Sequence, residues 1–115
     1  MHEAFTRLSP QQTREAVENG EAILLDIRRI DEFAAERIPG AILAPMEELQ
    51  PHALPSQETK TIILQCRSGG RTARLAEALL DNGYVESIAH LEGGILAWKA
   101  EGLPTICPDP AKAVT

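Results

Sequence analysis

The residues best suited to chemistry lie in one short run, Gln65-Cys66-Arg67-Ser68-Gly69-Gly70-Arg71-Thr72. An apolar segment, residues 61–64, precedes this run, and residues 73–80 follow it with the apolar spacing of a helix. A loop between a strand and a helix points its backbone N–H groups, and the positive end of the helix dipole, at whatever occupies its mouth. We therefore expect the sulfur of Cys66, the first loop residue, to lie in that mouth.

The neighbours of Cys66 favour its thiolate. Two glycines allow the backbone to curl without steric penalty, and two arginines add full positive charges. Hydrogen bonds and positive charge both stabilise a thiolate relative to a thiol. The run therefore predicts an activated nucleophile, Cys66, inside an anion-binding loop. The predicted substrate-binding residues of this loop are Arg67, Ser68, Gly69, Gly70, Arg71 and Thr72.

The composition limits the class of partner. A chain of 115 residues that is 43% hydrophobic is expected to form one globular domain with its own core. The formal net charge of −6 argues against non-specific nucleic-acid binding, which needs a basic surface. Against that overall sign, Arg67, Arg71 and Arg74 form a local basic cluster. An acidic protein with a basic pocket suits a small anion better than a polyanion.

Cysteine and histidine usage points to a free thiol and not to a metal site. The two cysteines, Cys66 and Cys107, are too few for a disulfide framework, and no Cys or His spacing matches a metal site. We therefore expect neither a metal nor a cofactor. The N-terminus lacks an apolar signal-like stretch, and no apolar run approaches the roughly 18 residues that span a bilayer. These features predict a cytoplasmic protein without a membrane segment.

Apolar segments and turn residues alternate along the chain. Ser9 and Gln12 predict a capping box at the start of the first helix, and Asp31 is expected to cap the second. This alternation predicts a small, mostly parallel α/β domain with right-handed crossovers. We place the domain at residues 1–106 and a tail or linker at 107–115. The expected strands are 4–7, 21–26, 41–44, 61–65 and 87–91; the expected helices are 10–19, 31–37, 72–82 and 95–101, with a single helical turn at 46–49.

Four segments along the chain carry a further pattern: Leu25-Asp26-Ile27-Arg28 with Asp31-Glu32-Phe33, Ile38-Pro39-Gly40-Ala41, the Cys66 loop, and Leu91-Glu92-Gly93-Gly94-Ile95-Leu96-Ala97-Trp98-Lys99. Together these segments resemble the rhodanese homology domain, a family of sulfurtransferases. They occur in the order typical of that family and span about residues 22–104. The resemblance implies a five-stranded parallel sheet with helices on both faces, and a persulfide carried by Cys66. It also matches residues 67–71 to the loop whose amides cradle the transferred sulfur.

The resemblance implies a two-step reaction. The Cys66 thiolate takes a sulfane sulfur from a donor such as thiosulfate, and cyanide or a thiol then accepts it. One alternative is a sulfur-relay or interaction module that serves a protein partner. A second is a cysteine-dependent phosphatase or arsenate reductase, whose loops have the spacing Cys-x5-Arg. The spacing from Cys66 to Arg71 is Cys-x4-Arg, one residue shorter, and such a tighter loop suits a single sulfur better than a phosphate.

The remaining polar and aromatic residues are expected to have structural roles. Asp26, Arg28 and Glu32 predict an ion-pair network at the turn between strand and helix. Arg37 stands where the family often has histidine, and we expect this change to affect local packing. The other expectations are a surface or packing role for His90, a core position for Trp98, a tight turn at Gly93-Gly94, and a tail thiol without a role at Cys107.

Overall fold

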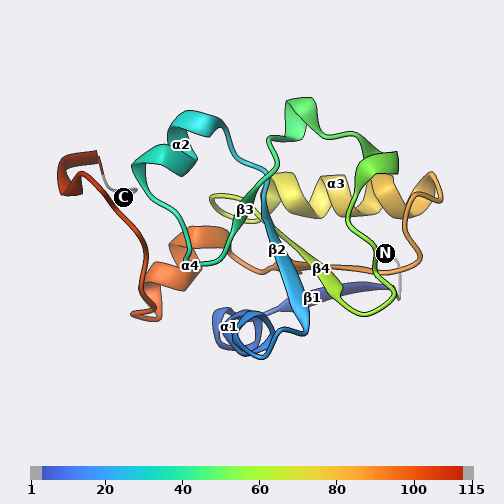
Figure 1. Cartoon of the computed structure of the whole chain (residues 1–115), viewed down its shortest axis with the longest axis horizontal. Helices are drawn as coiled ribbons and strands as arrows, with labels where there is room; N and C mark the ends of the chain where they lie inside the picture. The colour runs from blue at the N-terminus through green and yellow to red at the C-terminus, as the bar shows by residue number, and fades with distance from the viewer. Residues whose placement is uncertain (1–3, 113–115) are drawn as a thin grey trace.

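The structure is a computed structural model that describes residues 4–112, and its sheet has helices on both faces (Figure 1). Residues 1–3 of the predicted domain and 113–115 of the predicted tail lie outside the described residues. The strands are β1 (Phe5–Leu8), β2 (Ala22–Asp26), β3 (Ile42–Leu43), β4 (Thr61–Gln65) and β5 (Ile88–Leu91). The helices are α1 (Pro10–Glu18), α2 (Ile30–Ala35), α3 (Gly70–Asp81) and α4 (Gly94–Ala100), with short 3-10 helices at η1 (Met46–Glu48), η2 (Pro51–Ala53) and η3 (Pro110–Lys112).

The five strands form one sheet in the order β1-β5-β4-β2-β3. Every neighbouring pair is parallel, which confirms the predicted α/β class. Strand β4 lies at the centre, and its residues Ile62, Ile63 and Leu64 are all 0% exposed. Such burial on both faces is the reason that the central strands have continuous apolar sequences.

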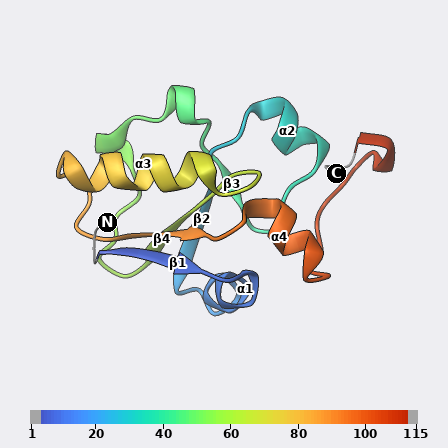
Figure 2. The same cartoon turned by 180° about the vertical axis from the view of Figure 1, so that it is seen from behind.

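Helices α1 and α4 cover one face of the sheet, and α3 covers the other (Figures 1 and 2). Because successive strand residues point to opposite faces, Ile63 and Leu64 belong to different cores. Leu64 packs in the core that includes Leu79 of α3, and Ile63 packs in the core that includes Trp98 of α4. Trp98 is 3% exposed, which confirms its predicted core position. Both cores therefore pack against β4, the strand that leads into residues 66–69, which we call the reactive loop because it contains the predicted nucleophile.

Three helix starts differ from the sequence-based expectation, and the smallest difference is at α4, which begins at Gly94, one residue before the expected start at 95. Helix α3 begins at Gly70 and not at Thr72, so Arg71 and Thr72 lie in its first turn. The N-cap of α2 is Arg29, and Asp31 lies inside the first turn, so the predicted Asp31 cap is wrong. The Glu32 side chain instead accepts the Arg29 N–H at 3.0 Å. The predicted capping box of α1, formed by Ser9 and Gln12, is present.

The segment after α4 packs back onto the domain. Arg37 and Ile106 form an antiparallel bridge, and the Trp98 indole donates to the Pro104 carbonyl at 2.8 Å. The Arg37 guanidinium also lies 5.1 Å from the centre of the Phe33 ring, a cation–π contact. Among residues 4–112, no helix has the length and apolar character to cross a membrane.

Candidate active site

Cys66 follows β4 directly and lies at the carboxyl edge of the sheet, where α/β proteins bind their ligands. Cys66 is 1% exposed, and its Sγ accepts a hydrogen bond from the Gly69 N–H at 3.1 Å. The first turn of α3 starts directly after this loop, so the positive end of the helix dipole points toward the same place. The sulfur therefore lies inside the loop, beside the Gly69 N–H.

The two loop glycines have different functions. Gly69 has φ +99°, a left-handed conformation that favours glycine, and a Cβ there would lie 3.1 Å from the Gly93 nitrogen. This conformation brings the Gly69 N–H onto Cys66 Sγ. Gly70 is already the first residue of α3, and a Cβ built on it meets nothing within 4 Å. Only Gly69 of this pair is thus required for the curl of the loop.

The start of α4 holds the carbonyl groups of the reactive loop. The Ile95 N–H donates to the Cys66 carbonyl at 3.0 Å, and the Leu96 N–H donates to the Arg67 carbonyl at 3.1 Å. In a trans peptide the N–H points opposite to the C=O, so the N–H groups of Arg67 and Ser68 point away from α4. Gly94 makes this contact possible, since a Cβ on it would lie 2.4 Å from the Arg67 oxygen. The predicted turn at Gly93-Gly94 therefore borders the loop and fixes its peptide groups.

Arg71 is held by a carboxylate outside the loop. Its Nη1 and Nη2 donate to Glu32 Oε1 and Oε2 at 3.2 and 3.3 Å, and its side chain is 33% exposed. Partial burial opposes the charge of Glu32, but the hydrogen bonds from Arg71 and the Arg29 amide outweigh it and lower the pKa of Glu32. The same hydrogen bonds with Glu32 raise the pKa of Arg71. The full positive charge expected at Arg71 is thus offset in part by Glu32.

The predicted ion-pair network divides into two parts. Arg28 and Asp26 are both fully buried and form a bidentate pair, with Nε to Oδ1 at 2.9 Å and Nη2 to Oδ2 at 2.7 Å. Arg28 Nη2 also donates to the Glu36 carbonyl at 2.6 Å, which ties the end of β2 to the chain after α2. These two residues are structural, as expected. Glu32, which was expected to join them, lies with Arg71 beside the reactive loop.

His90 is the functional candidate whose place the sequence did not reveal. It is 0% exposed, which agrees with the packing role and excludes the surface role, the two that were expected. Its Nδ1 lies 2.8 Å from Thr72 Oγ1, and Thr72 Oγ1 lies 3.6 Å from Cys66 Sγ. Burial lowers the pKa of His90, and the nearby Glu92 carboxylate opposes this shift. No sequence signal could have found this contact, because it depends on β5 lying next to β4.

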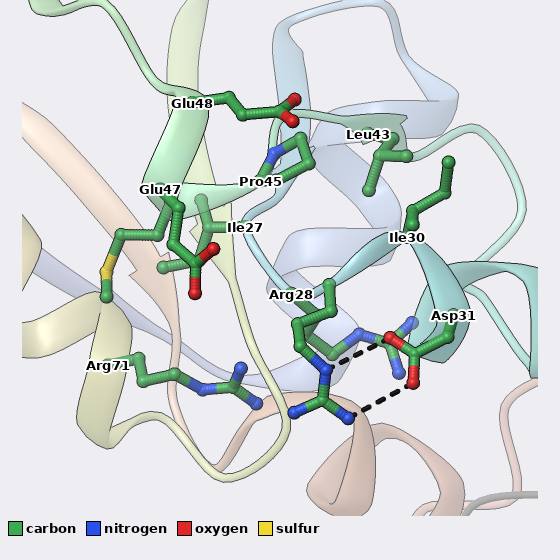
Figure 3. Close-up of a pocket in the computed structure, with 11 residues that line it drawn as sticks. Ile27, Arg28, Ile30, Asp31, Leu43, Pro45, Glu47, Glu48 and Arg71 are labelled. Atoms are coloured by element: carbon green, nitrogen blue, oxygen red, sulfur yellow. Dashed lines mark hydrogen bonds and ion pairs between the residues drawn. The ribbon is translucent and has the colours of Figure 1, made fainter.

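A cleft of about 530 Å³ lies beside the reactive loop, on the side of Arg71 (Figure 3). Its apolar wall includes Ile27, Ile30 and Leu43, and the side chains of Glu47 and Glu48 lie along its rim. Cys66 is not among its lining residues. Within residues 4–112, no group of three or more His, Cys, Asp or Glu side chains could hold a metal ion.

Residues 9–101 match the family model of the rhodanese-like domain. The chain therefore belongs to the rhodanese-like domain family. The fold is shared by a solved rhodanese-related protein from Thermoplasma volcanium, with a TM-score of 0.74 and 26% identity. That likeness covers 88% of this chain and 97% of the other.

Three relatives show what the family includes. An uncharacterized protein from Synechocystis sp. is 40% identical over 86% of this chain, and the chain spans only 55% of its length. A sulfurtransferase from Allochromatium vinosum is 33% identical, over 77% of this chain and 82% of that protein. The thiosulfate sulfurtransferase GlpE from Glaesserella parasuis is 29% identical, over 90% of this chain and 95% of that protein.

Proposed function

We propose that this protein is a sulfurtransferase that carries a sulfane sulfur as a persulfide on Cys66. The observation that supports this most is the position of Cys66 Sγ, buried at the head of α3 with the Gly69 N–H at 3.1 Å. Such a fixed donor, together with the helix dipole, stabilises negative charge on sulfur without any rearrangement during the reaction. The sulfurtransferase names of two relatives support the same reaction class.

In the first half-reaction the Cys66 thiolate attacks the outer sulfur of thiosulfate. The new bond joins Sγ to that sulfur, the sulfur–sulfur bond of thiosulfate breaks, and its electron pair leaves with sulfite. The persulfide that remains carries its negative charge on the terminal sulfur, within reach of the loop N–H groups. The basic residues Arg67 and Arg71 attract the anionic donor. Ser68 is exposed at the mouth and supplies a hydroxyl for the donor oxygens.

In the second half-reaction cyanide or a thiolate attacks the terminal sulfur of the persulfide. The bond between Sγ and that sulfur breaks, and Cys66 leaves as a thiolate ready for another donor. The two half-reactions share one covalent intermediate, so ping-pong kinetics are expected. A cytoplasmic setting suits this cycle, because reducing conditions keep the free Cys66 thiol available between turnovers.

A sulfur relay to a protein partner is the second candidate. Two exposed apolar side chains, Ile30 and Met46, line the cleft next to Arg71 and offer contact area for a large acceptor. A relay protein would gain the persulfide and pass it slowly to small acceptors. Fast turnover with cyanide would support a sulfurtransferase that acts on small acceptors. A stable persulfide on Cys66 with negligible turnover would support a relay to a protein partner.

The test is intact mass after incubation with thiosulfate. We expect the wild-type mass to rise by one sulfur atom and Cys66→Ser to abolish the gain. Cys107→Ser is the matched control, because it removes the other thiol of the chain and should keep the gain. A wild-type protein that gains no sulfur but hydrolyses an aryl phosphate would overturn the proposal in favour of a phosphatase.

A further inference from the structure

A buried imidazole lies behind the reactive sulfur, and sulfur transfer as described above makes no use of it. His90 pairs with Leu64 across the β4–β5 ladder, two residues before Cys66. Its side chain is enclosed by Thr72 of α3, the Phe5 ring at 4.9 Å and the residues Arg7 and Glu92. A Cβ on Gly69 would lie 3.6 Å from its Cε1, so the ring also borders the reactive loop.

The two nitrogens of His90 face different environments. Nε2 lies 3.2 Å from Glu92 Oε2 and 3.5 Å from Arg7 Nη1, and Arg7 in turn donates to Glu92 at 3.1 Å. Both of these partners have partly exposed side chains, at 52% and 41%. Nδ1 faces inward to the Thr72 hydroxyl. The nearer carboxylate favours a proton on Nε2, which leaves Nδ1 of the neutral ring as an acceptor.

Hydrogen-bond directions then run one way from the sulfur to the solvent. The Thr72 hydroxyl has one hydrogen and two acceptors in reach, the Gly69 carbonyl at 3.1 Å and His90 Nδ1 at 2.8 Å, and the shorter contact is the one to His90. Its oxygen lies 3.6 Å from Cys66 Sγ and can accept the thiol hydrogen. With the ring proton on Nε2 and the Thr72 hydrogen on its shorter contact, Cys66 donates to Thr72, Thr72 donates to Nδ1, and Nε2–H donates to Glu92. If each proton moves to the next atom of this chain, the two hydrogen bonds nearest the sulfur, Cys66–Thr72 and Thr72–His90, reverse their direction.

We propose that His90 is a positioning residue that takes up the Cys66 proton through the Thr72 hydroxyl. The sulfur–hydrogen bond breaks as that hydrogen binds Thr72 Oγ1, and the Thr72 hydrogen moves to His90 Nδ1. No net charge is created, since the products are a thiolate and an imidazolium. The imidazolium then donates to Thr72, Thr72 donates to the thiolate, and the Glu92 carboxylate faces the imidazolium on its outer side. The relay deepens the proposed function, because it supplies the thiolate that this function requires.

The burial of Cys66 makes such a route useful. At 1% exposure the sulfur has little access to water that could remove its proton directly. Burial alone also favours the neutral thiol, so an internal base offsets that effect. The charged groups that face His90 are Glu92, which stabilises the imidazolium, and Arg7, which opposes it. Glu92 forms the shorter contact with the ring.

The test is the rate of Cys66 alkylation by iodoacetamide as a function of pH, measured in a Cys107→Ser background. This assay needs no sulfur donor. In His90→Asn we expect the rate at pH 7 to fall about tenfold, the scale of losing an opposite charge near an ionisable group. Thr72→Val should lower the alkylation rate by the same factor, whereas Thr72→Ser keeps a hydroxyl and should react at the wild-type rate. The double variant His90→Asn/Thr72→Val should react no more slowly than either single variant. Above about pH 9, where a thiol ionises unaided, all rates should converge.

Other outcomes would contradict the relay. A merely structural role for His90 would lower the melting temperature and leave the pH midpoint of alkylation unchanged. A Thr72→Val variant that is alkylated at the wild-type rate would also refute the relay. If wild type gains no sulfur from thiosulfate but alkylation depends on His90 as expected, the relay stands and the proposed function fails. If sulfur loading proceeds and alkylation ignores His90, the function stands and the relay fails.

Discussion

Gly94→Ala tests whether the contact between α4 and the reactive loop determines the stability and the geometry of the site. Gly94 has φ +62°, and a Cβ on it would lie 2.4 Å from the Arg67 oxygen and 2.5 Å from the Cys66 oxygen. Both atoms belong to the backbone, so the loop must move away from α4. That movement stretches the Ile95 and Leu96 hydrogen bonds to these carbonyls.

The expected cost has two parts. The left-handed conformation costs an alanine about 1–2 kcal/mol. Each stretched hydrogen bond costs a further ~0.5–1.5 kcal/mol, so the free energy of unfolding should fall by about 2–5 kcal/mol in all. The displaced Cys66 carbonyl also shifts the cysteine relative to the Gly69 N–H. We therefore expect slower loading of sulfur from thiosulfate as well.

Urea unfolding and single-turnover sulfur loading measure the two effects. Gly102→Ala is the matched control, because Gly102 has φ +75° and a Cβ there meets nothing within 4 Å. It should lose only the conformational part, about 1–2 kcal/mol, and load sulfur at the wild-type rate. Equal losses of stability in the two variants, with equal loading rates, would refute the claim that α4 positions the loop.

Two ion pairs yield further predictions. Glu32→Gln should lower stability above pH 4.5, the ordinary value for this carboxyl, and the difference from wild type should vanish as pH falls through the lowered pKa of Glu32. Urea unfolding across this pH range checks it, and a difference that persists at pH 2 would contradict the assigned role of the Arg71 pair. Asp26→Asn should cost about 3–5 kcal/mol, because it leaves the buried Arg28 charge uncompensated. Asp31→Asn is its control on an exposed pair and should change the melting temperature little; a similar loss in both would contradict the importance of burial.

Local patterns in the sequence were sufficient to predict most of the helices and strands. The continuous apolar runs predicted β2 and β4, and the capping box predicted the start of α1, because these signals depend on neighbours close in the chain. The start of α3 was placed two residues late, at Thr72. Glycine is a poor helix former, so Gly70 was expected in the loop; in the structure it is the first residue of the helix.

The sequence by itself was sufficient to predict Cys66 as the reactive group and to place it in a loop between strand and helix. Cys66 comes directly after a buried strand, and Gly69 supplies the backbone conformation that brings an N–H to its sulfur. Both features are local, and the family segments appear in order along the chain. The hypothesis of an activated cysteine in an anion-binding loop could therefore be formed without coordinates.

Only the tertiary structure decided what surrounds that loop. The strand order places His90 behind Thr72, and the fold brings Glu32 of α2 within ion-pair distance of Arg71 at the start of α3. The α4 contact that orients the loop carbonyls likewise joins segments far apart in the chain. Such contacts follow from which strands are neighbours and how the crossovers pack, and no spacing within a single segment encodes them.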